Sequence, residues 1–159
     1  MITQKPILLV TETPPGTPNG FGVTLSCMFK NIEHQVLYTD ASYKKHGDNN
    51  GYLMGQVPFH SARRYYFKFL FGLIPEWRTR YSHRWLKKNL RKEYSSVYAF
   101  VYSVECLRFA DWISGYLGIP LFIHLADHSK EFQSIGITKI LRECSKLICI
   151  TEEMQKNFE

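Results

Sequence analysis

The chain has 159 residues, which is about the length of one globular domain. Its residues are 45% hydrophobic and 21% charged, so a disordered chain, a collagen-like repeat and a coiled coil are excluded. The net charge of +6 arises from 20 basic and 14 acidic residues, and any anionic partner should bind where the basic side chains gather.

The sequence contains no membrane-spanning or secretory signal. No run of about 18 apolar residues occurs, and the apolar stretch after Lys5 is too short for a signal-peptide core, so we expect a cytosolic protein. The cysteines show no CxxC spacing, which argues against a zinc site or a redox pair and predicts reduced, mostly buried thiols. They are Cys27, Cys106, Cys144 and Cys149.

The first half of the chain begins with a strand, a loop and a helix. Residues 6–11 are continuously apolar, which is typical of a strand buried on both faces of a parallel sheet. Residues 13–20 hold three prolines and two glycines and predict a loop, and residues 21–30 have helical spacing. The side chains available to face the sheet from this helix are Val23, Cys27 and Phe29. The elements predicted next are a strand at 35–39, a polar loop at 42–51 and a weak third strand at 53–59.

The second half alternates strands with helices. Gly118 and Pro120 are placed to end one of these helices. The predicted strands are 97–102, 121–125 and 146–150, and the predicted helices are 105–117, 138–144 and one that begins after Thr151. This alternation predicts an α/β fold, a Rossmann-like three-layer sandwich with a mostly parallel sheet, as a single domain over residues 1–159.

Ligands of such sheets bind beyond the carboxyl ends of the strands. Gly20-Phe21-Gly22 opens the first helix there, and its backbone N–H groups, with Asn19 before them, form a candidate loop for the phosphates of a donor. The alternative is that the loop needs glycine only for its backbone angles. Because the complete GxGxxG pattern is absent, the sequence does not predict a classical NAD site.

Polar residues also follow the strand at 121–125. Asp127 and His128 could hydrogen-bond a hydroxyl or act as acid or base, and His124 joins them if the strand ends before Asp127. The alternative for His124 is a buried, hydrogen-bonded strand histidine. No set of three ligands with metal-site spacing is visible, so we predict no metal.

A basic, aromatic segment lies between residues 61 and 93, where ten basic and two acidic residues give a net charge of +8. It is predicted to form two amphipathic helices on either side of Pro75. An anionic lipid surface and a solvated basic face are both open interpretations, whereas no motif supports nucleic-acid binding. The basic residues are Arg63, Arg64, Lys68, Arg78, Arg80, Arg84, Lys87, Lys88, Arg91 and Lys92.

Three stretches resemble family 4 (group 1) glycosyltransferases. Residues 7–15 with 19–23 resemble the family's first strand, Pro-containing loop and glycine turn. Residues 117–127 are similar to its Gly-Ile-Pro strand, and residues 141–154 resemble the segment that leads into a Ser-Glu-x-Met turn. The chain departs from the pattern at Phe21, between two glycines, and at Ala126, where many members have a histidine directly before the aspartate.

The resemblance implies the N-terminal half of a two-domain, GT-B-type enzyme that moves a sugar from a nucleotide sugar to an acceptor. Retention of configuration, no metal and no cofactor besides the donor substrate are expected. It places Asp127, His128 and His124 among the catalytic residues and Asn19, Gly20, Phe21 and Gly22 near the donor phosphates. The acceptor side would comprise Tyr102, Ser103, Glu105, Thr151 and Glu152.

The C-terminal nucleotide-sugar domain of such an enzyme has no counterpart in these residues, so the chain alone is expected to be inactive. Its expected partners are a nucleotide sugar bound together with that domain and a glycan or lipid-linked acceptor at the inner membrane face. The alternative function is a non-enzymatic Rossmann-like module that binds a small ligand or a protein through its basic segment.

Overall fold

The computed structural model describes residues 5–39, 51–53, 90, 93–127 and 130–149. Its strands form one six-stranded sheet with the order β3-β2-β1-β4-β5-β6, and every neighbouring pair is parallel. The strands are β1 (Ile7–Thr11), β2 (His34–Tyr38), β3 (Gly51–Leu53), β4 (Ser96–Val101), β5 (Leu121–Leu125) and β6 (Lys146–Cys149). This is the strand order of the Rossmann fold, so the predicted α/β, Rossmann-like class is confirmed.

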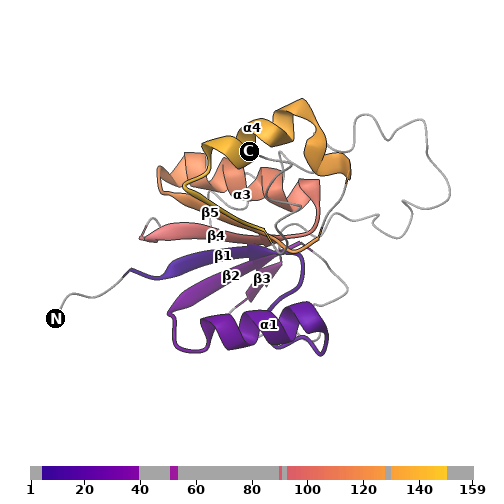
Figure 1. The fold of residues 1–159 in the computed structure, drawn as a ribbon. Coiled ribbons are helices and arrows are strands. Elements are labelled where there is room, and N and C mark those ends of the chain that lie inside the picture. Colours follow the sequence, from indigo (N-terminus) through magenta and orange to yellow (C-terminus); the bar gives the residue numbers. More distant parts are fainter. Residues whose placement is uncertain (1–4, 40–50, 54–89, 91–92, 128–129, 150–159) are drawn as a thin grey trace, which may run out of the picture.

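The helices cover both faces of this sheet. They are α1 (Gly20–Phe29), α3 (Val104–Leu117) and α4 (Ile135–Glu143), with a 3₁₀ turn at Lys130–Gln133. Figure 1 shows α1 on one face and both α3 and α4 on the other, which gives the described residues three layers. As predicted, α3 ends at Gly118, whose φ of +65° lies in the left-handed region that glycine adopts without strain.

The core consequently has two parts, one on each face of the sheet. Leu8 and Val10 of β1 belong to the cluster under α3 and α4, whereas Leu9 belongs to the cluster under α1 together with Leu25 and Phe29. All three β1 side chains are fully buried. Because consecutive side chains of a strand point to opposite faces, burial on both sides explains why this stretch is apolar without alternation.

The predicted buried side of α1 is partly wrong. Phe29 is buried as expected, but Val23 is 55% exposed and Cys27 is exposed, and their place is taken by Leu25. The buried positions of α1 are Gly22, Leu25 and Phe29, a spacing of three and four residues. The side is therefore set by the close approach of the helix at Gly22, which apolar periodicity alone does not indicate.

Two further predictions need correction. Of the four cysteines only Cys106 is buried, so the expectation of mostly buried thiols is wrong. The third strand is Gly51–Leu53, which begins inside the segment predicted as a loop, and residues 54–59 of the predicted strand lie outside the described residues. Only three residues pair with β2, too short a segment for an apolar pattern to stand out.

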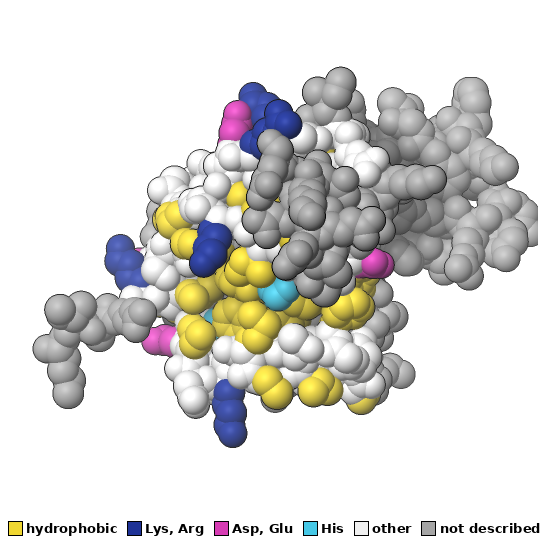
Figure 2. Space-filling view, viewed as in Figure 1, with side chains coloured by type: hydrophobic (Ala, Val, Ile, Leu, Met, Phe, Trp, Pro, Cys, Tyr) yellow, Lys and Arg dark blue, Asp and Glu magenta, His cyan; other side chains and the backbone are white. Residues whose placement is uncertain are grey.

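Among the described helices, α1 is the one that lies on its face of the sheet, and it lies on the side of β1 to β3. Phe100, His124 and Ile148 occupy one row across these strands, and Tyr98 and Phe122 belong to the row before it. Figure 2 shows hydrophobic side chains gathered in a band above α1, with a histidine among them.

Of the helices that the structure describes, none is long and apolar enough to cross a bilayer.

Candidate functional site

A cleft with a volume of about 760 Å³ opens at the carboxyl edge of the sheet. The chain leaves β1 toward α1 on one face and leaves the adjacent β4 toward α3 on the other, so this edge is the switch point where α/β sheets bind ligands. The lining residues come from the ends of three strands and the start of α1: Thr13, Asn19, Gly20, Phe21, Thr24, Phe100, Tyr102, His124 and Asp127.

Asn19 caps the first turn of α1. Its Oδ1 accepts a hydrogen bond of 2.7 Å from the backbone N–H of Gly22. The first N–H groups of a helix have no partner within the helix, and the dipole makes that end positive. Asn19 accepts from the N–H of Gly22 and, through its carbonyl, from the N–H of Val23, so the amides of Gly20 and Phe21, which line the cleft, are the candidates for contact with an anion.

The two glycines of this loop have different roles. A Cβ on Gly20 would meet nothing within 4 Å, so this position leaves the cleft open. A Cβ on Gly22 would lie 2.4 Å from the backbone oxygen of Thr17, a distance no side chain tolerates. Gly22 is therefore required for the close packing of α1 on its own loop, which supports the structural interpretation of that glycine rather than phosphate contact.

Aromatic rings form one wall of the cleft. Phe21 of α1 stacks on Tyr102, with ring centroids 5.3 Å apart and an interplanar angle of 21°. Phe21 also meets Phe100 edge-on at 5.9 Å. The hydroxyl of Tyr102 is hydrogen-bonded to Oγ1 of Thr13 at 3.3 Å. The wall thus joins the first turn of α1 to the end of β4 and to the loop after β1, and it presents an apolar surface with a polar rim.

His124 and Asp127 line the same cleft, since β5 ends at Leu125 and the chain turns between them. Nδ1 of His124 is hydrogen-bonded to the hydroxyl of Tyr98 at 3.0 Å, which leaves Nε2 as the nitrogen that a ligand can contact. Partial burial lowers the pKa of His124 and favours the neutral ring. The side chain of His124 is half-buried. It is therefore a hydrogen-bonded strand histidine and also a residue of the cleft lining, the two interpretations that the sequence left open.

Ser103 and Glu105 take part in the first turn of α3 and not in the cleft lining. Ser103 is the N-cap of that helix, and its hydroxyl is also hydrogen-bonded to Glu12. Glu105 is exposed. The predicted site residues His128, Thr151 and Glu152, and all ten basic residues predicted as an anion or membrane face, lie outside the described residues.

Sequence reasoning did not assign a role to Glu12, which is 4% exposed at the end of β1. Its carboxylate accepts hydrogen bonds from the backbone of Tyr102 and from the backbone and hydroxyl of Ser103. Burial raises its pKa, and those hydrogen bonds act in the opposite direction. A charged residue that directly follows an apolar strand and precedes a proline-rich loop was the available signal.

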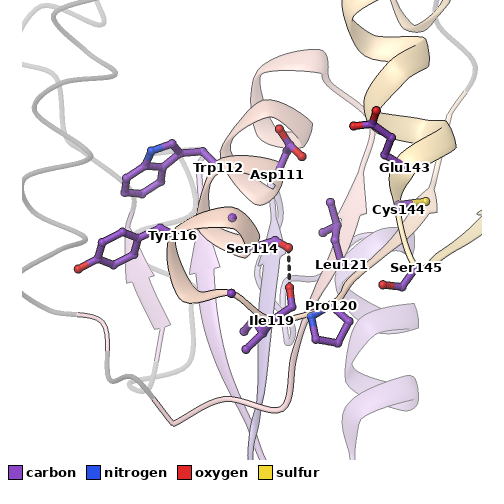
Figure 3. A pocket seen from close by; sticks show the side chains of 12 residues that line it. Asp111, Trp112, Ser114, Tyr116, Ile119, Pro120, Leu121, Glu143, Cys144 and Ser145 are labelled. Atoms are coloured by element: carbon purple, nitrogen blue, oxygen red, sulfur yellow. Dashed lines mark hydrogen bonds between the residues drawn. The ribbon is translucent and has the colours of Figure 1, made fainter.

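A second cavity, of about 720 Å³, lies at the opposite, amino edge of the sheet. Figure 3 shows Asp111 and Glu143 on neighbouring helices above it and Trp112 beside Tyr116. Burial raises the pKa of Asp111, and the Glu143 carboxylate adds to that rise. This edge receives the carbonyl ends of α3 and α4, whereas the first cleft receives the N-terminal end of α1.

Among the described residues no group of three histidine, cysteine or acidic side chains could hold a metal ion. No family model matches the chain, and no curated protein matches it.

Proposed function

We propose that this chain is the acceptor-side domain of a GT-B-type glycosyltransferase that moves a sugar from a nucleotide sugar to an acceptor. The observation that carries the proposal is the cleft at the switch point, to which both the glycine loop and Asp127 contribute. The resemblance of residues 7–23, 117–127 and 141–154 to family 4 transferases supports the same function.

The chemistry of the cleft suits a nucleotide sugar and a hydroxylated acceptor. Backbone N–H groups at the positive end of α1 favour phosphate oxygens. The carboxylate of Asp127 can accept hydrogen bonds from sugar hydroxyls, and the ring of His124, whose pKa burial lowers, offers Nε2 as a proton acceptor. An aromatic wall gives a sugar ring or a base an apolar surface to pack on.

Transfer in GT-B enzymes takes place between two domains, so this chain alone is expected to bind nucleotide sugars weakly and to show no turnover. We would titrate the ¹⁵N-labelled chain with UDP-glucose, UDP-N-acetylglucosamine and GDP-mannose and follow the amide resonances. At least one donor is expected to shift the amides of Gly20, Phe21, Tyr102 and Asp127.

A matched pair of variants tests whether those shifts come from the cleft. Gly20→Leu places a side chain in the open space at the start of α1 and should abolish them. Gly136→Leu makes the same change near the start of α4, where a Cβ also meets nothing within 4 Å, and should leave them unchanged. Shifts confined to the amino-edge cavity, or none with any donor, would favour the non-enzymatic binding module instead.

The proposal extends to an acceptor presented at the inner membrane face. Its support is the charge of the 61–93 segment, because each basic residue near an anionic surface contributes about 1 kcal/mol of attraction. In sedimentation with vesicles, the chain should bind phosphatidylglycerol-containing vesicles and not pure phosphatidylcholine. Equal binding to both compositions would remove the membrane part of the proposal and leave the transferase part standing.

A further inference from the structure

Glu12 is a buried acidic residue whose carboxylate accepts several hydrogen bonds. Its Oε1 accepts from the N–H of Ser103 at 2.7 Å and from the Ser103 hydroxyl at 2.6 Å. The N–H of Tyr102 lies 3.2 and 3.3 Å from the two carboxylate oxygens. A carboxylate this deeply buried is tolerated because neighbouring donors satisfy it. All of these donors belong to the turn between β4 and α3.

The residue after Glu12 holds the same tyrosine from its other end. Oγ1 of Thr13 is hydrogen-bonded to the Tyr102 hydroxyl, so two consecutive residues after β1 fix both the backbone and the ring tip of Tyr102. That ring forms the cleft wall with Phe21. The place of the wall therefore depends on a side chain that does not itself line the cleft.

We propose that Glu12 is a positioning residue of the cleft, which sets the aromatic wall by clamping the β4–α3 turn through Tyr102 and Ser103. The part of this inference that concerns ligand affinity rests on the proposed function, and the part that concerns the turn does not. Adjacent strands lie about 4.8 Å apart, and the longer side chain of glutamate spans the gap from β1 to the turn after β4. Aspartate is one carbon shorter and would not reach both donors.

The variant Glu12→Gln tests the clamp with almost no change in shape. The amide keeps one acceptor oxygen, which all of these donors reach, and places an NH₂ donor near the N–H of Tyr102 in place of Oε2. Amide hydrogen exchange at Tyr102 and Ser103 is expected to become at least about tenfold faster, since the acceptor of these bonds loses its charge and the new NH₂ group repels the Tyr102 N–H. The exchange of Leu9, Ala99 and Ile123, in the middle of the strands, should keep its wild-type rate.

Glu105→Gln is the matched control, because it removes an exposed carboxylate from the first turn of the same helix. Glu105→Gln should leave the exchange rates of the Tyr102 and Ser103 amides unchanged. Glu12→Asp separates reach from charge: it keeps the charge near α3 but should behave as Glu12→Gln does. Should Glu12→Gln fail to fold, Ser103→Ala removes one of the clamping bonds without a change of charge, and it should accelerate exchange at the same turn.

The effect on ligand affinity is measured with the nucleotide sugar that shifts the amide resonances of the cleft in the wild-type chain. Glu12→Gln should weaken its affinity several-fold and move the ring-proton resonances of Tyr102, while Glu105→Gln changes neither. A uniform acceleration of exchange at all amides, or an exchange pattern equal to that of Glu105→Gln, would overturn the clamp. If no donor binds the wild-type chain, the proposed function fails, and the exchange and ring-proton measurements still decide the clamp.

Discussion

The ring of Phe21 stacks on the ring of Tyr102 across the switch point of the sheet, with centroids 5.3 Å apart. Phe21 belongs to α1, which covers one face, and Tyr102 directly precedes Ser103, the cap of α3 on the other face. The contact is thus a direct side-chain link at the cleft between elements that lead to opposite sides of the sheet. Phe21 keeps 36% of its surface exposed, so the link remains accessible to a ligand.

This contact predicts an energetic coupling between the two rings. In a double-mutant cycle with Phe21→Leu and Tyr102→Leu, measured by chemical denaturation, we expect a coupling of about 0.5–1.5 kcal/mol. The control cycle combines Phe21→Leu with Tyr116→Leu, since Tyr116 stacks on Trp112 at the other end of α3. Those two changes should be additive. A coupling no larger than in the control cycle would show that the stacking contributes nothing to stability.

Gly22→Ala should destabilise the protein, although alanine normally stabilises a helix relative to glycine. Its Cβ would meet the Thr17 backbone at 2.4 Å, and the helix or its loop would have to move. We expect a loss of about 1–3 kcal/mol in the free energy of unfolding, as for other overpacked sites. Gly136→Ala, also in a helix but in open space, should instead stabilise the protein by up to about 1 kcal/mol through helix propensity. Similar free energies for the two variants would contradict the close approach at Gly22.

Leu25→Ala and Cys27→Ala test which side of α1 is buried. Leu25 is fully buried beneath the helix, so its truncation should cost about 2–5 kcal/mol of unfolding free energy. Cys27 is exposed, and its replacement should change that free energy by no more than about 0.5 kcal/mol. A larger loss of unfolding free energy for Cys27→Ala than for Leu25→Ala would show that the side of α1 predicted from apolar periodicity is the buried one.

The sequence was sufficient to predict the fold because parallel strands carry a strong signal. Residues 121–125 were predicted with the bounds that the structure gives, and Gly118 ends α3 in the predicted way. Apolar runs buried on both faces cannot be mistaken for solvated loops. The short strand at Gly51–Leu53 was misplaced because three residues that pair on one edge leave no such run.

The cleft was predictable in part. The glycine loop and Asp127 meet at one edge because the topology brings strand ends together, whatever their separation in sequence. The function of Glu12 was not predictable, since it depends on β4 lying beside β1, and a list of residues does not reveal which donors a buried carboxylate meets. The need for glycine at position 22 was not predictable either, because it arises from the path of the loop at Thr17.

The stability of the protein should depend on pH through His124. Burial lowers the pKa of this histidine in the folded protein below the value of about 6.5 expected in the unfolded chain. The unfolded state therefore binds more protons in the window between the two values, and the contribution of His124 to stability falls as the pH is lowered from about 6.5. Tyr98, which is hydrogen-bonded to His124, and Asp127, which lines the same cleft, are titratable side chains that the test retains.

His124→Gln removes the titrating ring and should make the free energy of unfolding less dependent on pH between about 6.5 and 5. Phe122→Leu is the control, because it changes a half-buried side chain on the same strand without removing a titratable group, and it should keep the wild-type pH slope. Urea denaturation at half-unit pH steps measures both. If His124→Gln retains the wild-type slope, the ring is already protonated as easily in the folded state as in the unfolded one. In that case burial would not be what favours the neutral imidazole of His124 in the cleft.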